Sequence, residues 1–437
     1  MPPSPDPNRR FAEGVVRRLR DSGRQALLAG GCVRDLLLGR TPKDYDVATD
    51  ARPDEVRDLF GRKRTLAVGA SFGVVVVVPS KAERDRGVEP VEVATFRTEG
   101  PYLDGRRPEH VAFATPEQDA KRRDFTINGM FLDPIEGRVL DFVGGEADLK
   151  AGVVRAIGDP RERMAEDKLR LLRAVRFAAT MGFRLDDATA AAVREMAGQL
   201  TVVSAERITQ ELRRMLVHPN RRRAVELCAE CGLLEVIFPE LTPVLRLGKV
   251  GERSPWERTL RALDLLDRPT FESTLVVLLH SVAGRDDLPS TDDVCRRLRL
   301  SNAERELAVW LTEHREDLGA IRHRLRWFFK RLCAHPAVAD LLSVERALRT
   351  AAGESLGDVE YVERFLAETP RSEIDPPPLL TGADLIALGL KPGPEFKRLL
   401  DAVRNAQLDG AIVTRDEAIA LARRLHGGGG ADTNEPR

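Results

Sequence analysis

Two aspartates separated by one residue, Asp44 and Asp46, are the side chains of this sequence best suited to catalysis. Residues i and i+2 of a strand point to the same side of a sheet, so two carboxylates at this spacing can share divalent cations such as Mg²⁺. A paired-metal site of this kind activates an attacking hydroxyl and stabilises the leaving oxygen in phosphoryl transfer. The spacing alone is a weak signal, because about one or two such pairs arise by chance in a chain of this size.

The residues just upstream strengthen the signal. Gly30 and Gly31 stand where a short strand is expected to turn into a helix, and backbone amides at such a turn can approach a phosphate closely. Arg34, one turn into that helix, can add a positive charge. The alternative is an ordinary turn followed by two solvated aspartates. The combination favours a phosphate-binding turn beside two metal-binding carboxylates.

A third acid, Glu92, lies in the apolar segment VEPVEVATF. An acid inside so apolar a strand is either a further catalytic carboxylate or an outward-facing residue of a half-exposed strand. We predict the catalytic role.

The elements that must position these residues change in character along the chain. The first third predicts an α/β arrangement, in which β-branched runs ending at Val78 and Phe96 form strands. Residues 98–120 are expected to be a long polar loop. After Pro160 the apolar residues recur at helical spacing almost to the end. The sequence therefore predicts an α+β chain whose later domains are helical.

Composition narrows the classes of protein. Lys plus Arg and Asp plus Glu both number 69, so the net charge indicates no nucleic-acid partner, although a local basic patch would suffice. The sequence has no run of about 18 apolar residues and no apolar signal-peptide core, so we expect a cytoplasmic protein with no membrane span. Cys228 and Cys231 form a CxxC without a second ligand pair, and we expect them to be core residues.

Five segments in order resemble the class II tRNA nucleotidyltransferases, the bacterial CCA-adding enzymes, and their close relatives the bacterial poly(A) polymerases. They are GGCVRDLLLGRTPKDYDVAT, VEVATFRTEGPYLDGRRPEHV, RRDFTINGMFLDP, GDPRERMAEDKLRLLRAVRFA and SAERITQEL. The likeness is strong over residues 25–240, thinner over 241–370, and returns at 380–425. It implies a nucleotidyltransferase (polymerase-beta-like) head followed by helical neck, body and tail domains, at residues 1–155, 156–217, 218–370 and 371–437.

The resemblance also implies roles for matching positions. Asp44 and Asp46 would hold Mg²⁺, and the glycine turn with Arg34 would bind the incoming triphosphate of CTP or ATP. The segment RRDFTIN would contact the nucleotide and discriminate ribose from deoxyribose. The nucleotide-contacting residues implied beyond the turn are Arg123, Asp124, Asn128, Asp167, Arg170, Arg173 and Arg176.

A protein side-chain pair can select C and A without a nucleic-acid template. Both bases offer an exocyclic amino donor beside a ring-nitrogen acceptor, whereas uracil and guanine present the reverse order. An ionised carboxylate only accepts hydrogen bonds and a guanidinium only donates them. An Asp167–Arg170 pair, expected on one helix with Arg173 and Arg176, would therefore match C and A and repel U and G.

Three weaker features are open to two interpretations each. The cluster Arg221–Arg223 either lies near tRNA phosphate or is a solvated helix start. The segment 100–111 resembles the flexible loop of members that add A, which relatives adding only C lack or shorten. His280 is followed by Ser281, where a His-Asp phosphohydrolase module would have aspartate, so we expect a helix residue without metal chemistry.

The function predicted from the resemblance is the addition of CMP and AMP from CTP and ATP to the 3′ end of tRNA, with release of pyrophosphate. The alternatives are a poly(A) polymerase, a tRNA nucleotidyltransferase that adds only A, and an inactive RNA-binding protein. The expected partners are tRNA and the two nucleotides, with no DNA partner, and the sequence leaves the oligomeric state open.

Overall fold

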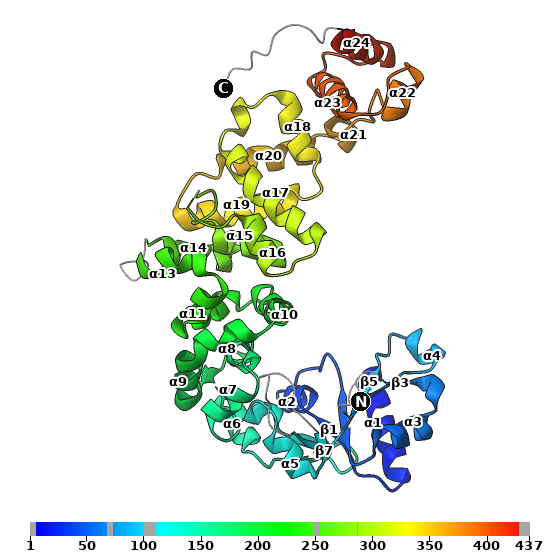
Figure 1. Cartoon of the computed structure of the whole chain (residues 1–437), viewed down its shortest axis with the longest axis vertical. Coiled ribbons are helices and arrows are strands. Elements are labelled where there is room, and N and C mark those ends of the chain that lie inside the picture. Colours follow the sequence, from blue (N-terminus) through cyan, green and yellow to red (C-terminus); the bar gives the residue numbers. More distant parts are fainter. Residues whose placement is uncertain (1–5, 68–72, 100–110, 248–253, 286, 428–437) are drawn as a thin grey trace. The chain divides into compact units, whose positions relative to one another are not determined.

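The computed structural model describes residues 6–67, 73–99, 111–247, 254–285 and 287–427. The chain divides into two compact units, Met1–Thr242 and Pro243–Arg437 (Figure 1). The first unit contains the α/β head and the helices that follow it. The division into four domains at the boundaries given above stays a prediction.

The head consists of a mixed seven-stranded sheet with helices packed against it. Its strand order is β3-β4-β5-β2-β1-β8-β9, and β2 and β5 are the parallel neighbours in an otherwise antiparallel arrangement. The bounds are α1 (Pro7–Asp21), β1 (Ala26–Ala29), α2 (Gly31–Leu37), β2 (Asp46–Thr49), α3 (Pro53–Phe60), η1 (Arg62–Arg64), β3 (Thr65–Leu66), β4 (Val74–Val77), α4 (Lys81–Arg84), β5 (Val91–Thr95), β6 (Arg97–Glu99), β7 (Val111–Phe113), α5 (Pro116–Lys121), η3 (Thr126–Asn128), β8 (Phe131–Asp133), β9 (Arg138–Leu140), α6 (Gly145–Ala151) and β10 (Val153–Val154).

Apolar residues of the central strands hold the sheet in place. Leu27, Ala48 and Phe131 are buried in one cluster with Phe96, whose ring meets that of Phe131 edge to face at 5.8 Å. Helix α1 buries one face, including Val15 and Leu19, because its apolar residues recur at helical spacing. This core fixes the position of the central strands, which carry the acidic residues.

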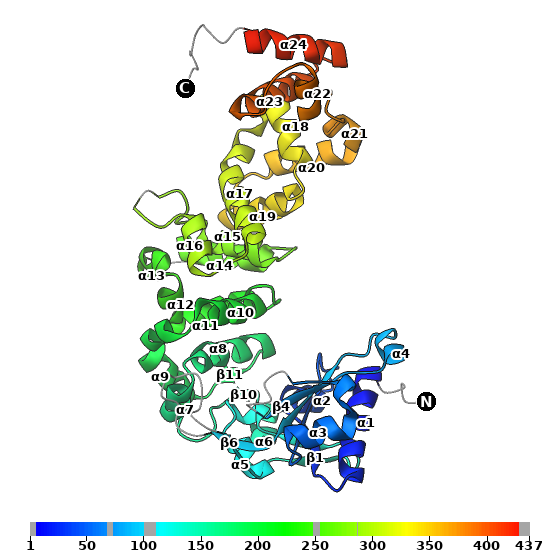
Figure 2. The ribbon, with the colours of Figure 1, turned by 45° about the vertical axis from the view of Figure 1, so that its right-hand side comes forward.

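The helices after the head belong to the same unit and lie beside it. Helix α8 packs against α10 and α11, and Figure 2 shows these helices stacked next to the small strand pair β10–β11. Their bounds are α7 (Pro160–Glu166), α8 (Leu169–Met181), β11 (Arg184–Leu185), α9 (Asp187–Met196), η4 (Ala197–Val202), α10 (Ala205–Leu216), α11 (Arg221–Glu230), α12 (Leu233–Ile237) and η5 (Pro239–Leu241). The next helix, α13 (Thr242–Leu247), begins at the last residue of this unit and belongs otherwise to the second.

The described part of the second unit is helical. Its last helices enclose a core that includes Leu385, Leu399 and Val403. The bounds are α14 (Pro255–Leu265), α15 (Phe271–Leu279), α16 (Thr291–Arg297), α17 (Asn302–Gly319), η6 (Ile321–His323), α18 (Arg326–Ala334), α19 (Val338–Ala352), α20 (Gly357–Glu368), α21 (Arg371–Ile374), α22 (Gly382–Ala387), α23 (Pro394–Asp409) and α24 (Arg415–Gly427). The predicted fold class, an α/β head followed by helical domains, is confirmed.

One expected element is wrong. The polar loop predicted at 98–120 contains a hairpin, β6 with β7, and the helix α5. Thr115 caps α5 by accepting from the Gln118 amide at 3.3 Å, and Pro116 occupies its first turn. These helix-start signals stand inside a polar segment, so a judgement made on polarity alone misses them. Residues 100–110, which carry most of the segment that resembles the A-adding loop, lie outside the described residues.

Candidate nucleotide-binding and catalytic site

The two strands that carry the predicted acids, β2 and β5, are neighbours at the centre of the sheet. Asp46, the first residue of β2, lies directly opposite Glu92 of β5 in the parallel pairing. Asp44 lies two residues before Asp46, outside the strand, and is exposed. The expectation that both aspartates sit in a strand is therefore half correct, yet all three acids share one region.

The three acids repel one another. Burial, followed by the charges of Asp44 and Glu92, raises the pKa of Asp46 to about 7, against the opposing charge of Arg123. Repulsion that raises a carboxylate pKa marks negative charge that the protein does not neutralise by itself. Among the described residues, no group of three or more His, Cys, Asp or Glu side chains is already arranged to hold a metal ion.

The glycine turn has the geometry predicted for it. Gly30 caps α2 with φ 72° and ψ −130°, a backbone conformation that L side chains rarely adopt. A Cβ atom at Gly30 would lie 2.9 Å from Arg123 Nη1, whereas one at Gly31 would lie 3.7 Å from Arg34 Nη2. Gly30 is thus required both for the turn and for the close approach of Arg123.

We expect Gly30→Ala to lower the free energy of unfolding by about 1–3 kcal/mol, because it combines backbone strain with a steric clash. Gly31→Ala is the matched control, since Gly31 is helical and its neighbourhood is open. It should leave the free energy of unfolding unchanged or raise it by up to about 1 kcal/mol. Urea unfolding of both variants measures the difference, and equal losses would contradict this account of the turn.

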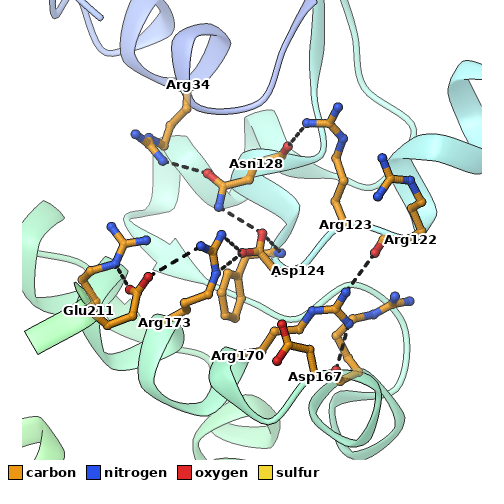
Figure 3. A network of polar contacts seen from close by, with 12 residues as sticks. Arg34, Arg122, Arg123, Asp124, Asn128, Asp167, Arg170, Arg173 and Glu211 are labelled. Carbon is orange, nitrogen blue, oxygen red and sulfur yellow. Dashed lines mark hydrogen bonds and ion pairs between the residues drawn. The ribbon is translucent and has the colours of Figure 1, made fainter. Parts of the chain in front are cut away.

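A series of polar contacts connects α2, the helix after the glycine turn, with α8 and α10 beyond the head (Figure 3). Arg34 Nη1 donates to Asn128 Oδ1 at 2.7 Å, and Asn128 Nδ2 donates to Asp124 Oδ1 at 3.1 Å. Arg173 Nε of α8 donates to Asp124 Oδ2 at 2.9 Å. Arg173 Nη1 in turn lies 3.8 Å from Glu211 Oε1 of α10. Four of the predicted nucleotide-contacting residues therefore form one connected network.

An aromatic ring lies beneath three of these cations. The guanidinium carbons of Arg34, Arg173 and Arg176 lie 5.4, 5.3 and 3.9 Å from the ring centre of Phe177. Phe177 packs edge to face on the buried ring of Phe125. The ring attracts the three cations and holds their positive charge in one place, which suits an anionic ligand such as a triphosphate.

Asp124 is the buried anion of the network. Burial alone would raise its pKa, but the charge and hydrogen bonds of Arg173, with the hydrogen bond from Asn128, outweigh burial and lower the pKa to about 2. Asp124 is therefore an ionised acceptor at neutral pH. Its carboxylate keeps Arg173 turned toward the head.

The lowered pKa of Asp124 makes the stability that its contact with Arg173 contributes dependent on pH. Because the pKa of Asp124 is about 2 in the fold, against an ordinary value of 3.8, its ionised form stabilises the fold above pH 4. We expect Asp124→Asn to lose about 2 kcal/mol at neutral pH. The difference from wild type should shrink as the pH falls from about 4 toward 2.

Denaturant unfolding between pH 7 and 3 measures this difference. Asp54→Asn serves as the control, since the Asp54 side chain is 82% exposed. A gap between wild type and Asp124→Asn that stays constant down to pH 3 would argue against the ion pair as its cause.

The predicted base-reading pair is held differently from expectation. Asp167 lies between α7 and α8 in an extended conformation, so the expectation of one helix through Asp167 and Arg176 is wrong at its first residue. Its carboxylate accepts from Arg207 Nη1 at 3.1 Å and Nη2 at 2.7 Å. Arg170 donates instead to Glu166 and to the Arg163 carbonyl. The two side chains are close in sequence but have separate partners.

Sequence reasoning missed Arg207 and Glu211 as members of the site. They stand one helical turn apart on α10, in the segment SAERITQEL, and contact opposite charges of the pocket. Glu211 is buried and pairs with Arg173, Arg176 and Arg214. An acid four residues after a base on an amphipathic helix usually indicates a surface ion pair, so no local signal set these two apart.

The three weaker features also have an outcome. In the predicted RNA cluster, Arg221 is buried, while Arg222 and Arg223 pair with glutamates of their own helix. The cluster is thus not a row of uncompensated cations. His280 Nδ1 bonds the Val277 carbonyl at 2.8 Å at the end of α15, as a helix residue would.

Cys228 and Cys231 are buried thiols, as predicted for core residues. Burial raises the pKa of both thiols. In the described residues, no helix is long and apolar enough to cross a membrane.

Two sequence families match parts of the chain. The family described as the poly A polymerase head domain matches residues 26–155, and the probable RNA and SrmB-binding site of polymerase A matches residues 182–245. The first match spans the sheet with its acids and the glycine turn. The second covers α10 and therefore Arg207 and Glu211.

Individual relatives match almost the whole chain. The CCA-adding enzyme of Geobacillus sp. (strain WCH70) is 42% identical over 415 residues, which cover 93% of this chain and 95% of the relative. That of Lactococcus lactis subsp. cremoris (strain MG1363) is 41% identical over 414 residues, covering 94% of each.

Solved structures agree. The Bacillus stearothermophilus CCA-adding enzyme in complex with CTP superposes with a TM-score of 0.73 at 29% identity, covering 97% of this chain and 98% of that one. The Thermotoga maritima CCA-adding enzyme complexed with tRNA shares the fold, with a TM-score of 0.59 at 21% identity and 95% coverage of both chains. With two relatives above 40% identity over nearly the full length, the chain belongs to the family of CCA-adding enzymes, the template-independent RNA nucleotidyltransferases that process tRNA.

Proposed function

We propose that this protein adds CMP and AMP from CTP and ATP to the 3′ end of tRNA and releases pyrophosphate. The observation that carries the proposal is the pairing of Asp46 with Glu92 on neighbouring strands, beside Arg123 and the Gly30 turn. Carboxylates next to a cluster of arginines suit a reaction in which a hydroxyl attacks the phosphate of a bound nucleotide. The similar B. stearothermophilus enzyme was solved with CTP, in line with that chemistry.

Asp44 and Asp46 would hold Mg²⁺. Nucleotidyltransferases of this family generally use a divalent metal. Burial, followed by the charges of Asp44 and Glu92, raises the pKa of Asp46 to about 7, and a hard cation bound to the carboxylate oxygens would offset this crowded negative charge. When bound, such a cation lowers the pKa of an attacking hydroxyl and stabilises the charge on the leaving oxygen.

The remaining residues bind and orient the nucleotide. Arg34 and the backbone of the glycine turn would bind the triphosphate. The ring of Phe177 holds Arg34, Arg173 and Arg176 next to one another. The tRNA 3′-hydroxyl would then attack the α-phosphate, with pyrophosphate leaving in line. Arg123, Asp124 and Asn128 would contact the nucleotide and discriminate ribose from deoxyribose.

Asp167 and Arg170 would read the base. Asp167 already accepts two hydrogen bonds from Arg207, which fix the orientation of its carboxylate. One carboxylate oxygen offers about two acceptor positions, so Asp167 can accept from a base amino group without releasing Arg207. Arg170 would have to turn from Glu166 toward the base to complete the C/A pattern.

The names of the relatives favour CCA addition over the alternatives. The curated relatives above are CCA-adding enzymes, whereas the head family alone would fit a poly(A) polymerase equally well. An inactive RNA-binding protein would have no need of Asp44, Asp46 and Arg123. Because tRNA and the nucleoside triphosphates are cytoplasmic molecules, we propose a cytoplasmic location for the protein.

One experiment separates these possibilities. Purified protein is given tRNA lacking its 3′ end, with labelled CTP or ATP separately and together, and the product length is measured. Two C and one A added in order support the proposal. Long A tracts would indicate a poly(A) polymerase, a single A on tRNA ending in CC an A-adding enzyme, and no product with any substrate an RNA-binding protein.

A further inference from the structure

The carboxylate of Asp119 binds Arg123, and none of the roles proposed above involves it. Asp119 lies in α5, and only 2% of its surface is exposed. Aspartate is rarely buried to this degree unless its charge is paired. Its burial therefore calls for an account of what it pairs with.

Five donors converge on this one carboxylate. Asp119 Oδ1 accepts from the Arg97 backbone amide at 3.2 Å, from Arg122 Nε at 2.9 Å, and from Arg122 Nη2 at 2.7 Å. Asp119 Oδ2 accepts from Nε and Nη2 of Arg123, both at 3.1 Å. Each oxygen thus binds the side of one arginine, and the arrangement has little freedom to rotate.

The remaining face of Arg123 points at the proposed nucleotide site. Its Nη1 donates to the Asn128 carbonyl at 3.2 Å and lies where a Cβ of Gly30 would be. The guanidinium lies 5.0 Å over the ring of Phe131. Asp119 therefore fixes the edge of Arg123 opposite the glycine turn, and the ring fixes its plane.

Two arginines bind the one carboxylate of Asp119. Burial alone would raise the pKa of Asp119, but the charges of Arg123 and Arg122 and the hydrogen bonds from Arg122 and the Arg97 amide lower it below its usual range. The carboxylate of Asp119 therefore holds the side chains of both arginines in place.

The second arginine connects the same carboxylate to the base-reading residues. The Arg122 carbonyl accepts from Arg170 Nη2 at 3.3 Å, and Figure 3 shows Arg122 and Arg170 joined in this way. Arg122 therefore binds Asp119 through its side chain and Arg170 through its backbone carbonyl. Asp119 is thus connected to Arg123 directly and to Arg170 through Arg122.

We propose that Asp119 is a positioning residue for nucleotide recognition, which orients Arg123 against the sugar and triphosphate and steadies the backbone that holds Arg170. This inference rests on the proposed function, because it assumes that Arg123 contacts the nucleotide. Asp119 does not touch the reacting atoms. Its substitution should therefore weaken nucleotide binding and ribose discrimination more than the maximal rate.

The test replaces Asp119 by asparagine. An amide has one acceptor oxygen for two arginines and turns a donor toward the other guanidinium, so Arg123 or Arg122 loses its partner. We expect the KM for CTP to rise by about tenfold or more, since a displacement of about 1 Å can cost up to about 100-fold. The preference for CTP over 2′-deoxy-CTP should fall by a similar factor, while kcat changes less. Calorimetric binding of CTP without tRNA should weaken in parallel.

Asp133→Asn is the matched control. Asp133 is as buried as Asp119, belongs to the same unit and pairs with Arg20, with none of the nucleotide residues among its partners. Its substitution should lower the melting temperature and leave KM and ribose preference unchanged. Asp119→Asn with a lowered melting temperature but wild-type KM and ribose preference would overturn the proposal, because its role would then be structural alone.

Asp119→Glu keeps the test decisive where the asparagine variant does not fold. The charge remains, but the longer side chain cannot keep both side-on contacts in so closed a site, so an intermediate KM and ribose preference are expected. Wild-type values for Asp119→Glu would also overturn the proposal. If wild-type protein extends no tRNA at all, the proposed function fails instead, which the extension assay detects separately.

Discussion

Asp46→Ala is expected to abolish nucleotide incorporation without destabilising the protein. Loss of a carboxylate that holds the catalytic cation typically lowers the rate by about 10³-fold or more. The fold should not suffer, since Asp46 is half-buried beside Asp44 and Glu92 and no hydrogen bond from a cation of the protein compensates it among the described contacts. Removing a charge in that position relieves repulsion. The free energy of unfolding should therefore stay equal or rise.

Single-turnover extension of tRNA with labelled CTP measures the rate, and urea unfolding measures stability. Asp44→Ala should behave in the same way as Asp46→Ala. Asp58→Ala is the control, since Asp58 is a 71% exposed carboxylate on the neighbouring helix α3. A rate within about tenfold of wild type for Asp46→Ala would sink the assignment of the catalytic acids, because such a residual rate is too high for a metal-binding residue.

The sequence was sufficient to predict the part of the site that depends on local spacing. Gly30, Gly31 and Arg34 lie within one turn of chain, so the strand-to-helix turn they form could be inferred from their types alone. The place of Glu92 on an apolar strand could also be inferred, whereas its catalytic role stays a prediction. Its pairing with Asp46 could not be inferred, because the two residues lie 46 positions apart in the sequence and the register of their strands depends on the whole sheet.

The contacts across elements were beyond sequence reasoning. Asp167 and Arg170 were expected to face the base together from one helix, but Arg207 of another helix binds the Asp167 carboxylate. Helical spacing predicts which side chains share a face, and it carries no information about a competing partner 40 residues later. Asp119 shows the opposite case. A spacing of three and four residues from Arg122 and Arg123 is typical of an ordinary helical ion pair. The burial of Asp119 is what distinguishes it from such a pair.

Asp167→Asn tests whether a carboxylate is what rejects U and G. An ionised carboxylate can only accept hydrogen bonds, whereas an amide presents one acceptor and one donor and can therefore match the reversed pattern of uracil. We expect incorporation of C and A to slow by about 10²-fold, and the preference for CTP over UTP to fall by about 10²–10³-fold. The contact with Arg207 should weaken as well, since the amide carries no charge.

Asp187→Asn is the matched control for this change, because Asp187 is an exposed aspartate on the nearby helix α9. It should leave both the rate and the base preference at wild-type values. Separate single-nucleotide assays with each of the four triphosphates on tRNA lacking its 3′ end give the preference directly. If Asp167→Asn slows all four nucleotides equally, Asp167 serves to bind the nucleotide rather than to choose it. In that case the selection of C and A must come from Arg170 and the backbone around it.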